Sequence, residues 1–183
     1  MSKSVSALEG QSYTGFADVA ELGLCGMVAI RCDLSSKTLA KALTVAGLCV
    51  PDTRQIALGA EGSTAWMGPD ELLIMCDYAQ AAALQGKLAN ALAAEHALVT
   101  NVSDARAVFR VSGEKADQVI QKLCPVDLAA LKTGEIRRTR AAQVAVALWR
   151  SSQDEITLIS FRSVAGYVMG LLELSSRKGG EIA

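Results

Sequence analysis

Apolar residues in the first part of the chain form short runs, separated by two stretches with helical periodicity. The short runs predict strands at residues 24–32, 55–58, 63–67, 71–76 and 97–102. One helix is expected to begin after its cap, Ser35, and to end before Gly47, and a second is expected over residues 79–95. Gly-Pro-Asp at 68–70 predicts a hairpin turn. This order of elements is typical of the split βαβ, or ferredoxin-like, arrangement.

The rest of the chain repeats that order of elements without repeating the sequence. Strands are predicted at residues 105–111, 143–149 and 155–161, and the last two are expected to form a hairpin. A helix is expected from Gly113 to Cys124, where the following proline ends it. A last helix is expected to have Ser163 as its cap. Gly166 and Gly170 are expected to let this helix pack closely against a sheet.

The pattern therefore predicts an α+β fold with two ferredoxin-like lobes. Each lobe is expected to be an antiparallel sheet with helices on one face. The first lobe is predicted over residues 23–103 and the second over residues 104–178. Residues 1–22 are polar and irregular in pattern, so we expect them to form an N-terminal arm that is ordered only where it docks on something else.

Composition and charge narrow the possible functions. Lysine and arginine total 18 against 19 aspartate and glutamate residues, and the resulting net charge of −1 argues against nucleic acid as a partner. The apolar run at 164–174 is too short for a spanning helix, which needs about 20 residues, so no membrane association is expected. The five cysteines include no Cys-x-x-Cys pair, and residues 1–9 lack the core of a signal peptide. We therefore expect reduced thiols in a soluble, cytoplasmic protein.

The sequence shows no catalytic cluster. His96 is the only histidine, and its place after Glu95 at a predicted helix end favours a surface residue that interacts with the helix dipole. One histidine without suitably spaced cysteines cannot build a zinc site, and no phosphate loop or dinucleotide fingerprint is present. A Cys–His nucleophile pair stays open, although no cysteine has a local signature for it. We predict no catalytic, cofactor-binding or metal-binding residue in this chain.

Three arginines are the candidates for contact with a partner protein. Arg106 and Arg110 alternate with apolar residues along the strand predicted at 105–111, so they share one face of the sheet. A solvated face is the commoner use of such a row, but arginine is also enriched at interfaces. Arg162, just before the last helix, is the third candidate. The basic stretch at 137–140 is expected to be a solvated loop or a strand edge.

Three segments of the chain carry motifs of one known family. Residues 66–74 read Trp-Met-Gly-Pro-Asp-Glu-Leu-Leu-Ile, similar to that family's Trp-x-Gly-Pro-Asp-Glu run before an apolar strand. Residues 102–113 and 124–128 resemble its Ser-x-x-Arg strand, its Ser-Gly helix start and its Cys-Pro-x-Asp-Leu segment. Residues 161–167 resemble its Arg-Ser-Phe/Val-Ala stretch. The three segments stand in the family's order, and together they resemble the gamma subunit family of heterotetrameric sarcosine oxidase. The chain departs from the family at Leu72, where an aromatic residue is usual, and in its more basic segment around 137–142.

The resemblance implies a role in assembly. Such a gamma subunit would have no active site of its own and would bind the alpha, beta and delta subunits of an oxidase that demethylates sarcosine to glycine. FAD, FMN, NAD and tetrahydrofolate are then expected on those partner subunits and not on this chain. The family is similar in fold to folate-binding proteins of aminomethyltransferase type, so a free-standing folate-binding protein is the alternative. An enclosed pocket with a carboxylate at its base would favour that alternative.

The last predicted helix is expected to meet a partner. Its apolar residues occur nearly all round it: Val164, Tyr167, Val168, Met169, Leu171, Leu172 and Leu174. A helix without a clear polar face lies deep in a core or is covered by another chain. Charged residues make up only 20% of the chain, against about 25–35% expected at the surface of a small soluble protein. We therefore expect the isolated chain to expose an apolar patch near this helix or the N-terminal arm, or to self-associate through it.

Overall fold

The computed structural model describes residues 4–182, which form two compact units. The central unit holds Cys25–Ser103, and the terminal unit combines the chain up to Leu24 with the chain from Asp104 onward. The chain passes from the terminal unit to the central unit after Leu24 and returns to the terminal unit after Ser103. Within the described residues, no helix is both long and apolar enough to cross a membrane.

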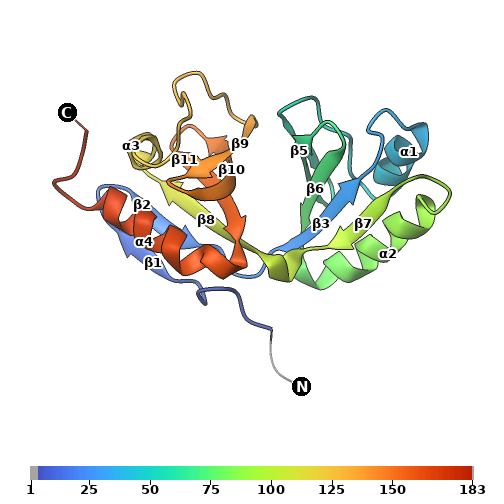
Figure 1. Ribbon diagram of the computed structural model, residues 1–183, viewed down its shortest axis with the longest axis horizontal. Coiled ribbons are helices and arrows are strands. Elements are labelled where there is room, and N and C mark those ends of the chain that lie inside the picture. Colours follow the sequence, from blue (N-terminus) through green and yellow to red (C-terminus); the bar gives the residue numbers. More distant parts are fainter. Residues whose placement is uncertain (1–3, 183) are drawn as a thin grey trace. The chain divides into compact units, whose positions relative to one another are not determined.

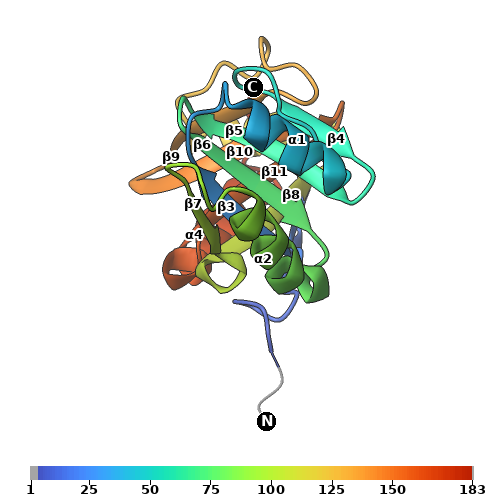
Figure 2. The same cartoon turned by 90° about the vertical axis from the view of Figure 1, so that its right-hand side faces the viewer.

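The central unit is a five-stranded sheet with two α-helices on one face (Figures 1 and 2). The strands pair antiparallel in the order β4-β5-β6-β3-β7. Their bounds are β3 Gly26–Arg31, β4 Ile56–Gly59, β5 Gly62–Gly68, β6 Glu71–Cys76 and β7 Leu98–Asn101. The helices are α1 Lys37–Val45 and α2 Ala81–Ala91, the latter preceded by the 3₁₀ turn η1 Tyr78–Gln80. Leucines of both helices pack on Val28, Ile30, Leu72 and Ile74 of the sheet.

The start of α1 differs by one residue from the prediction. Ser36, not Ser35, is the cap, because its Oγ accepts hydrogen bonds from the backbone amides of Thr38 and Leu39. Ser35 instead donates to the carboxylate of Asp33 at 2.7 Å. The helix ends before Gly47, as predicted. Gly47, two residues after α1, has a φ of 71°, a left-handed conformation that glycine adopts without strain.

The terminal unit is a six-stranded sheet whose pairs are antiparallel, in the order β1-β2-β8-β11-β10-β9. The strands are β1 Ser12–Thr14, β2 Asp18–Glu21, β8 Arg106–Ser112, β9 Ile136–Ala141, β10 Val144–Ser152 and β11 Glu155–Phe161. The helices are α3 Ala116–Gln121 and α4 Ala165–Ser176, with the 3₁₀ turns η2 Ser103–Ala105 and η3 Arg162–Val164. Figure 1 shows α4 lying along the strands β1 and β2. The core between helices and sheet contains Phe109, Leu148, Leu158 and Leu172, all fully buried.

The N-terminal segment, predicted as an irregular arm, contributes two strands to the terminal unit. Strand β2 pairs with β8, and Val19 of β2 is buried in the core opposite Val111. The backbone amide of Phe16 donates to the carbonyl oxygen of Ser176 at 2.8 Å, which ties this segment to the end of α4. With only four residues and one large apolar side chain, β2 has too little alternation to be recognised as a strand.

Two further details of the terminal unit differ from the sequence prediction. The basic segment 137–140 belongs to β9, the edge strand of the sheet, so the strand-edge alternative is correct. Charged side chains on an edge strand discourage pairing with other chains. Ser163 does not cap α4: it lies inside η3, and no side-chain hydrogen bond caps Val164 at the start of the helix. Despite these differences, the predicted α+β class with two antiparallel sheets is confirmed.

Candidate partner-binding surfaces

The outward face of α4 carries an apolar stripe. Tyr167 is 50% exposed and Leu174 is 59% exposed, and seven positions apart they lie on the same side of the helix. Gly170 lies between them, and a Cβ added there would meet no heavy atom within 4 Å. Gly166 is open in the same way, so the expectation that these glycines allow close packing on a sheet is wrong. The inner face of α4 buries Val168 and Leu172.

The three arginines predicted to contact a partner already have contacts within the terminal unit. Arg106 lies over the ring of Phe161, its cross-strand neighbour, with 4.3 Å from guanidinium carbon to ring centroid. The Nε atom of Arg110 lies 3.9 Å from the carboxylate of Glu155. Arg106 and Arg110 do share one face of β8, as predicted, while Phe109 between them points into the core. Val108 on the arginine face is 5% exposed, so this face is not open along its whole length.

Arg162 holds the N-terminal segment. Its Nη2 atom donates to the carbonyl oxygens of Val5 at 3.0 Å and Ser6 at 3.2 Å. The same segment is held from another side by Glu21, which is 4% exposed. The Oε2 atom of Glu21 accepts from the hydroxyl of Ser6 at 2.9 Å and from the amide of Gly10 at 2.8 Å. The side chain of Arg162 therefore serves the fold of the terminal unit.

The Gly-Pro-Asp-Glu motif is explained by an ion-pair cluster at the hairpin between β5 and β6. Arg31 of β3 donates to Asp70 at 3.3 Å and to Glu71 at 2.9 Å. Adjacent residues within a strand point to opposite faces. Asp70 and Glu71 nevertheless meet the same guanidinium, because Asp70 lies in the turn and only Glu71 belongs to β6. The motif thus links the hairpin to the neighbouring strand β3.

The Cys-Pro-x-Asp-Leu segment is also structural. Cys124 and Leu128 are buried, and the carboxylate of Asp127 accepts hydrogen bonds from the amides of Ala129 and Ala130.

Arg150 of β10 holds the loop that follows α3. Its guanidinium donates to the carbonyl oxygens of Leu128, Leu131 and Gln153 and to the carboxylate of Asp117.

Two of the cysteines have thiols of raised pKa, and the histidine is exposed. Burial raises the pKa of Cys124 to about 11, and burial followed by the charge of Cys76 raises the pKa of Cys25 to about 11. Thiols with such pKa values are protonated at neutral pH and react slowly as nucleophiles. His96 is exposed beyond the end of α2. Among residues 4–182, no group of three or more histidine, cysteine, aspartate or glutamate side chains is placed to hold a metal ion.

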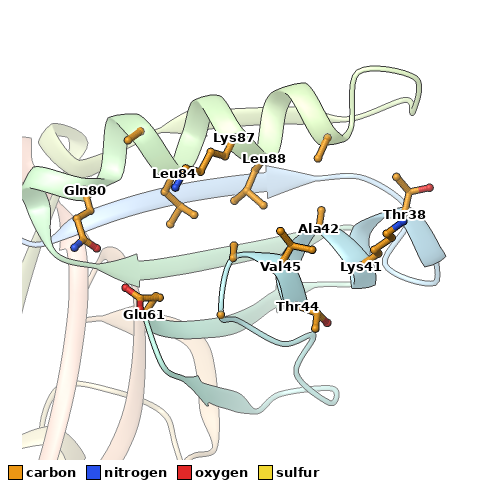
Figure 3. A pocket seen from close by; sticks show the side chains of 14 residues that line it. Thr38, Lys41, Ala42, Thr44, Val45, Glu61, Gln80, Leu84, Lys87 and Leu88 are labelled. Atoms are coloured by element: carbon orange, nitrogen blue, oxygen red, sulfur yellow. The ribbon is translucent and has the colours of Figure 1, made fainter.

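A groove of about 960 Å³ runs between α1 and α2 of the central unit (Figure 3). Ala42 and Val45 of α1 face Leu84 and Leu88 of α2 across it. Alanines of both helices widen it, because their short side chains leave space between the helix backbones. Val45 is 81% exposed, an unusual position for a large aliphatic side chain, whereas Ala42 and Leu88 in the floor of the groove are buried.

Charged side chains lie on both sides of this groove. Lys41 comes from α1 and Lys87 from α2, and both are exposed. Glu61, at the turn between β4 and β5, lies toward the end of the groove where Gln80 is found (Figure 3). No sequence pattern indicated this groove, because its lining comes from two helices whose proximity becomes visible only in the folded unit.

The fold defines a class. The fold, with two antiparallel sheets that each have helices on one face, is similar to that of the glycine cleavage system aminomethyltransferase T from Bartonella henselae. Its structure matches 84% of this chain and 44% of its own chain at a TM-score of 0.65 and 14% identity. At that identity the likeness concerns the fold alone. The chain is therefore an α+β protein with an aminomethyltransferase-like fold.

Closer relatives identify the family. The model of the "Sarcosine oxidase, gamma subunit family" matches residues 31–177. A sarcosine oxidase subunit gamma from Arthrobacter sp. is 31% identical over 81% of this chain and 74% of its own length. One from Corynebacterium sp. (strain P-1) is 30% identical over the same shares. The heterotetrameric sarcosine oxidase from Corynebacterium sp. U-96, solved in complex with pyrrole 2-carboxylate, matches 90% of this chain and 87% of its own at 25% identity and a TM-score of 0.78. This chain belongs to the sarcosine oxidase gamma subunit family.

Proposed function

We propose that this chain is the gamma subunit of a heterotetrameric, sarcosine oxidase-type enzyme and supports its assembly without an active site of its own. The observation that carries the proposal is the match, over nearly the whole chain, to a structure of such a heterotetramer. The partners are the alpha, beta and delta subunits of the same oxidase, in the cytoplasm. FAD, FMN, NAD and tetrahydrofolate are bound by partner subunits and not by this chain.

The exposed face of α4 is the first candidate for the contact with the partners. Tyr167 and Leu174 form an apolar stripe, and the open glycines between and beside them let another backbone approach closely. Phe161, just before η3, is 46% exposed and adds aromatic surface under Arg106. The proposed charged contacts remain Arg106, Arg110 and Arg162, although each of them also contacts a residue of the terminal unit.

A folate-binding role without partners is less well supported. A pterin site needs a slot with a buried carboxylate at its base. The groove between α1 and α2 has a carboxylate, Glu61, but this side chain is exposed at its end. Buried Glu21 does not line that groove, and its Oε2 atom is already used by Ser6 and Gly10.

Co-purification tests the proposal. A tagged copy of the chain, expressed in the source organism, is expected to recover two flavoprotein-sized partners and one small one, with flavin absorbance in the complex. The isolated chain is expected to be colourless and to lack amine oxidase activity. Flavin bound to the isolated chain, or purification without any partner, would overturn the proposal.

Surface variants locate the contact. Replacing Tyr167 and Leu174 by serine is expected to weaken assembly, whereas the same change at Leu58 and Leu98 of the central unit, which are at least as exposed, serves as the control. The combined change of Arg106, Arg110 and Arg162 to glutamate is expected to weaken assembly as well. Unchanged assembly in the arginine variant would show that the charged contacts were assigned to the wrong surface.

A further inference from the structure

The groove between α1 and α2 is an unfilled apolar surface in the central unit. Its lining includes Ala42, Val45, Leu84 and Leu88, which face one another across the gap (Figure 3). Val45 and Ala83 are exposed, so this part of the apolar lining is in contact with solvent. Apolar grooves between helices are used to bind the apolar face of an amphipathic helix.

The charges around the groove are not balanced within the chain. Among the described residues, neither Lys41 nor Lys87 makes an ion pair or a hydrogen bond. Both ammonium groups border the apolar lining, one from each helix. The single carboxylate of the lining, Glu61, lies toward the end near Gln80, away from Lys41 (Figure 3). An occupant with an apolar face and acidic flanks would complement this arrangement.

We propose that the groove binds a short amphipathic helix of a partner subunit, with its apolar face on Val45 and Leu84 and its acidic residues beside Lys41 and Lys87. The inference rests on the proposed function, since the helix belongs to another subunit of the same oxidase. The N-terminus of this helix lies near Glu61, because the positive end of the helix dipole is attracted by a carboxylate. The volume of about 960 Å³ accommodates the side chains of a few helical turns.

Zero-length cross-linking of the purified complex tests the contact directly. A carbodiimide joins lysine amines to carboxylates in contact, and mass spectrometry identifies the joined peptides. We expect Lys41 and Lys87 to be joined to aspartate or glutamate residues of one partner segment with helical apolar spacing. Lys37, exposed on α1 but outside the groove, serves as the control and should give no such product. Cross-links to a second copy of this chain, or none from either groove lysine, would overturn the inference.

Two variant pairs supply an independent measurement in the full complex. Ala83→Trp fills the groove, while Ala82→Trp places the same side chain on α2 outside it. The double charge reversal of Lys41 and Lys87 to glutamate has a matched control, the double change of Lys37 and Lys115 to glutamate. Lys37 and Lys115 are exposed and lie outside the groove. Each groove variant is expected to weaken assembly at least about tenfold, and each control less than about twofold. Circular dichroism and thermal unfolding verify that all four variants fold.

The outcomes separate the two proposals. If the wild-type chain recovers no partner, the proposed function fails and the groove inference fails with it. If the wild-type complex forms and the groove variants assemble as well as their controls, only the groove inference fails. A fatty acid or another small amphiphile found in the groove by native mass spectrometry would also overturn it, in favour of a small-molecule site.

Discussion

The guanidinium group of Arg162 donates a hydrogen bond of 3.0 Å to the carbonyl oxygen of Val5, although the two residues are 157 positions apart. Arg162→Ala removes this bond and the one to Ser6. We expect the free energy of unfolding to fall by about 1–2 kcal/mol. The amide of Gly10 is expected to exchange its hydrogen faster, since the segment around it is held less firmly. Hydrogen exchange measures this, and Arg177→Ala, at an exposed position, is the control. Unchanged exchange at Gly10 would contradict the assignment.

Replacement of two glycines by alanine is expected to have opposite effects. A Cβ on Gly15 would lie 1.9 Å from the carbonyl oxygen of Ser176, so Gly15→Ala must displace the N-terminal segment or the end of α4. We expect a loss of about 1–3 kcal/mol in unfolding free energy. Gly170→Ala meets no neighbour and improves helix propensity, so it should stabilise the isolated chain by up to about 1 kcal/mol. Chemical denaturation of both variants measures the difference, and equal effects would refute this account.

Arg150 is expected to be among the most sensitive polar positions. Arg150→Met leaves the carboxylate of Asp117 and three carbonyl oxygens without their donor. We expect a loss of about 2–3 kcal/mol from the broken hydrogen bonds, since the side chain of Asp117 is 36% exposed and is hydrated once the arginine, itself 11% exposed, is gone. Arg140→Met, on the exposed side of the edge strand β9, should change the unfolding free energy by less than about 0.5 kcal/mol. Similar losses in the two variants would mean that the loop after α3 is held by other contacts.

The raised pKa values of Cys25 and Cys124 predict a loss of stability at high pH. Both values are about 11 in the folded chain, above the ordinary value of 9.0. The unfolded thiols therefore lose their protons first, and unfolding is favoured as the pH rises from about 9 to about 11. Below pH 9 the stabilisation is fully present. Denaturation measured from pH 8 to 11 checks this, and the double change of Cys25 and Cys124 to alanine should flatten the dependence. An equally steep dependence in that variant would contradict it.

The sequence predicted much of the fold because most elements have strong local signals. The hairpin at Gly68 and the apolar strands β3, β6, β8 and β11 are where their patterns indicated. Strand β2 was missed, because pairing with β8 and not its own composition makes it a strand. For β9 the sequence left a loop and a strand edge as alternatives, and its arginines are tolerated at a sheet edge. Ser163 looked like a cap, but η3 inserts a tighter turn before α4.

The candidate sites were less predictable for a physical reason. Arg106 and Arg110 were found because a strand alternates its side chains, and that rule needs no tertiary information. The groove depends on Lys41 and Lys87 lying on two helices side by side, which no local pattern encodes. The role of Arg162 depends on a segment that is distant in sequence. The family resemblance gave the assembly role, yet the motifs that carried it proved to be structural: Arg31 with Asp70, and Asp127 with its turn.

The division of the chain into a central unit and a unit made from both ends has a consequence for synthesis on the ribosome. Every strand of the central sheet has been made once residue 101 has left the tunnel. The terminal sheet must wait, because β2 pairs with β8 and β8 pairs with β11, which ends at Phe161. Domains generally fold as units during translation. The β1–β2 pair therefore precedes the central unit in the chain but meets β8 only after it, so the nascent chain carries this pair without its neighbouring strand until residue 112 has been made.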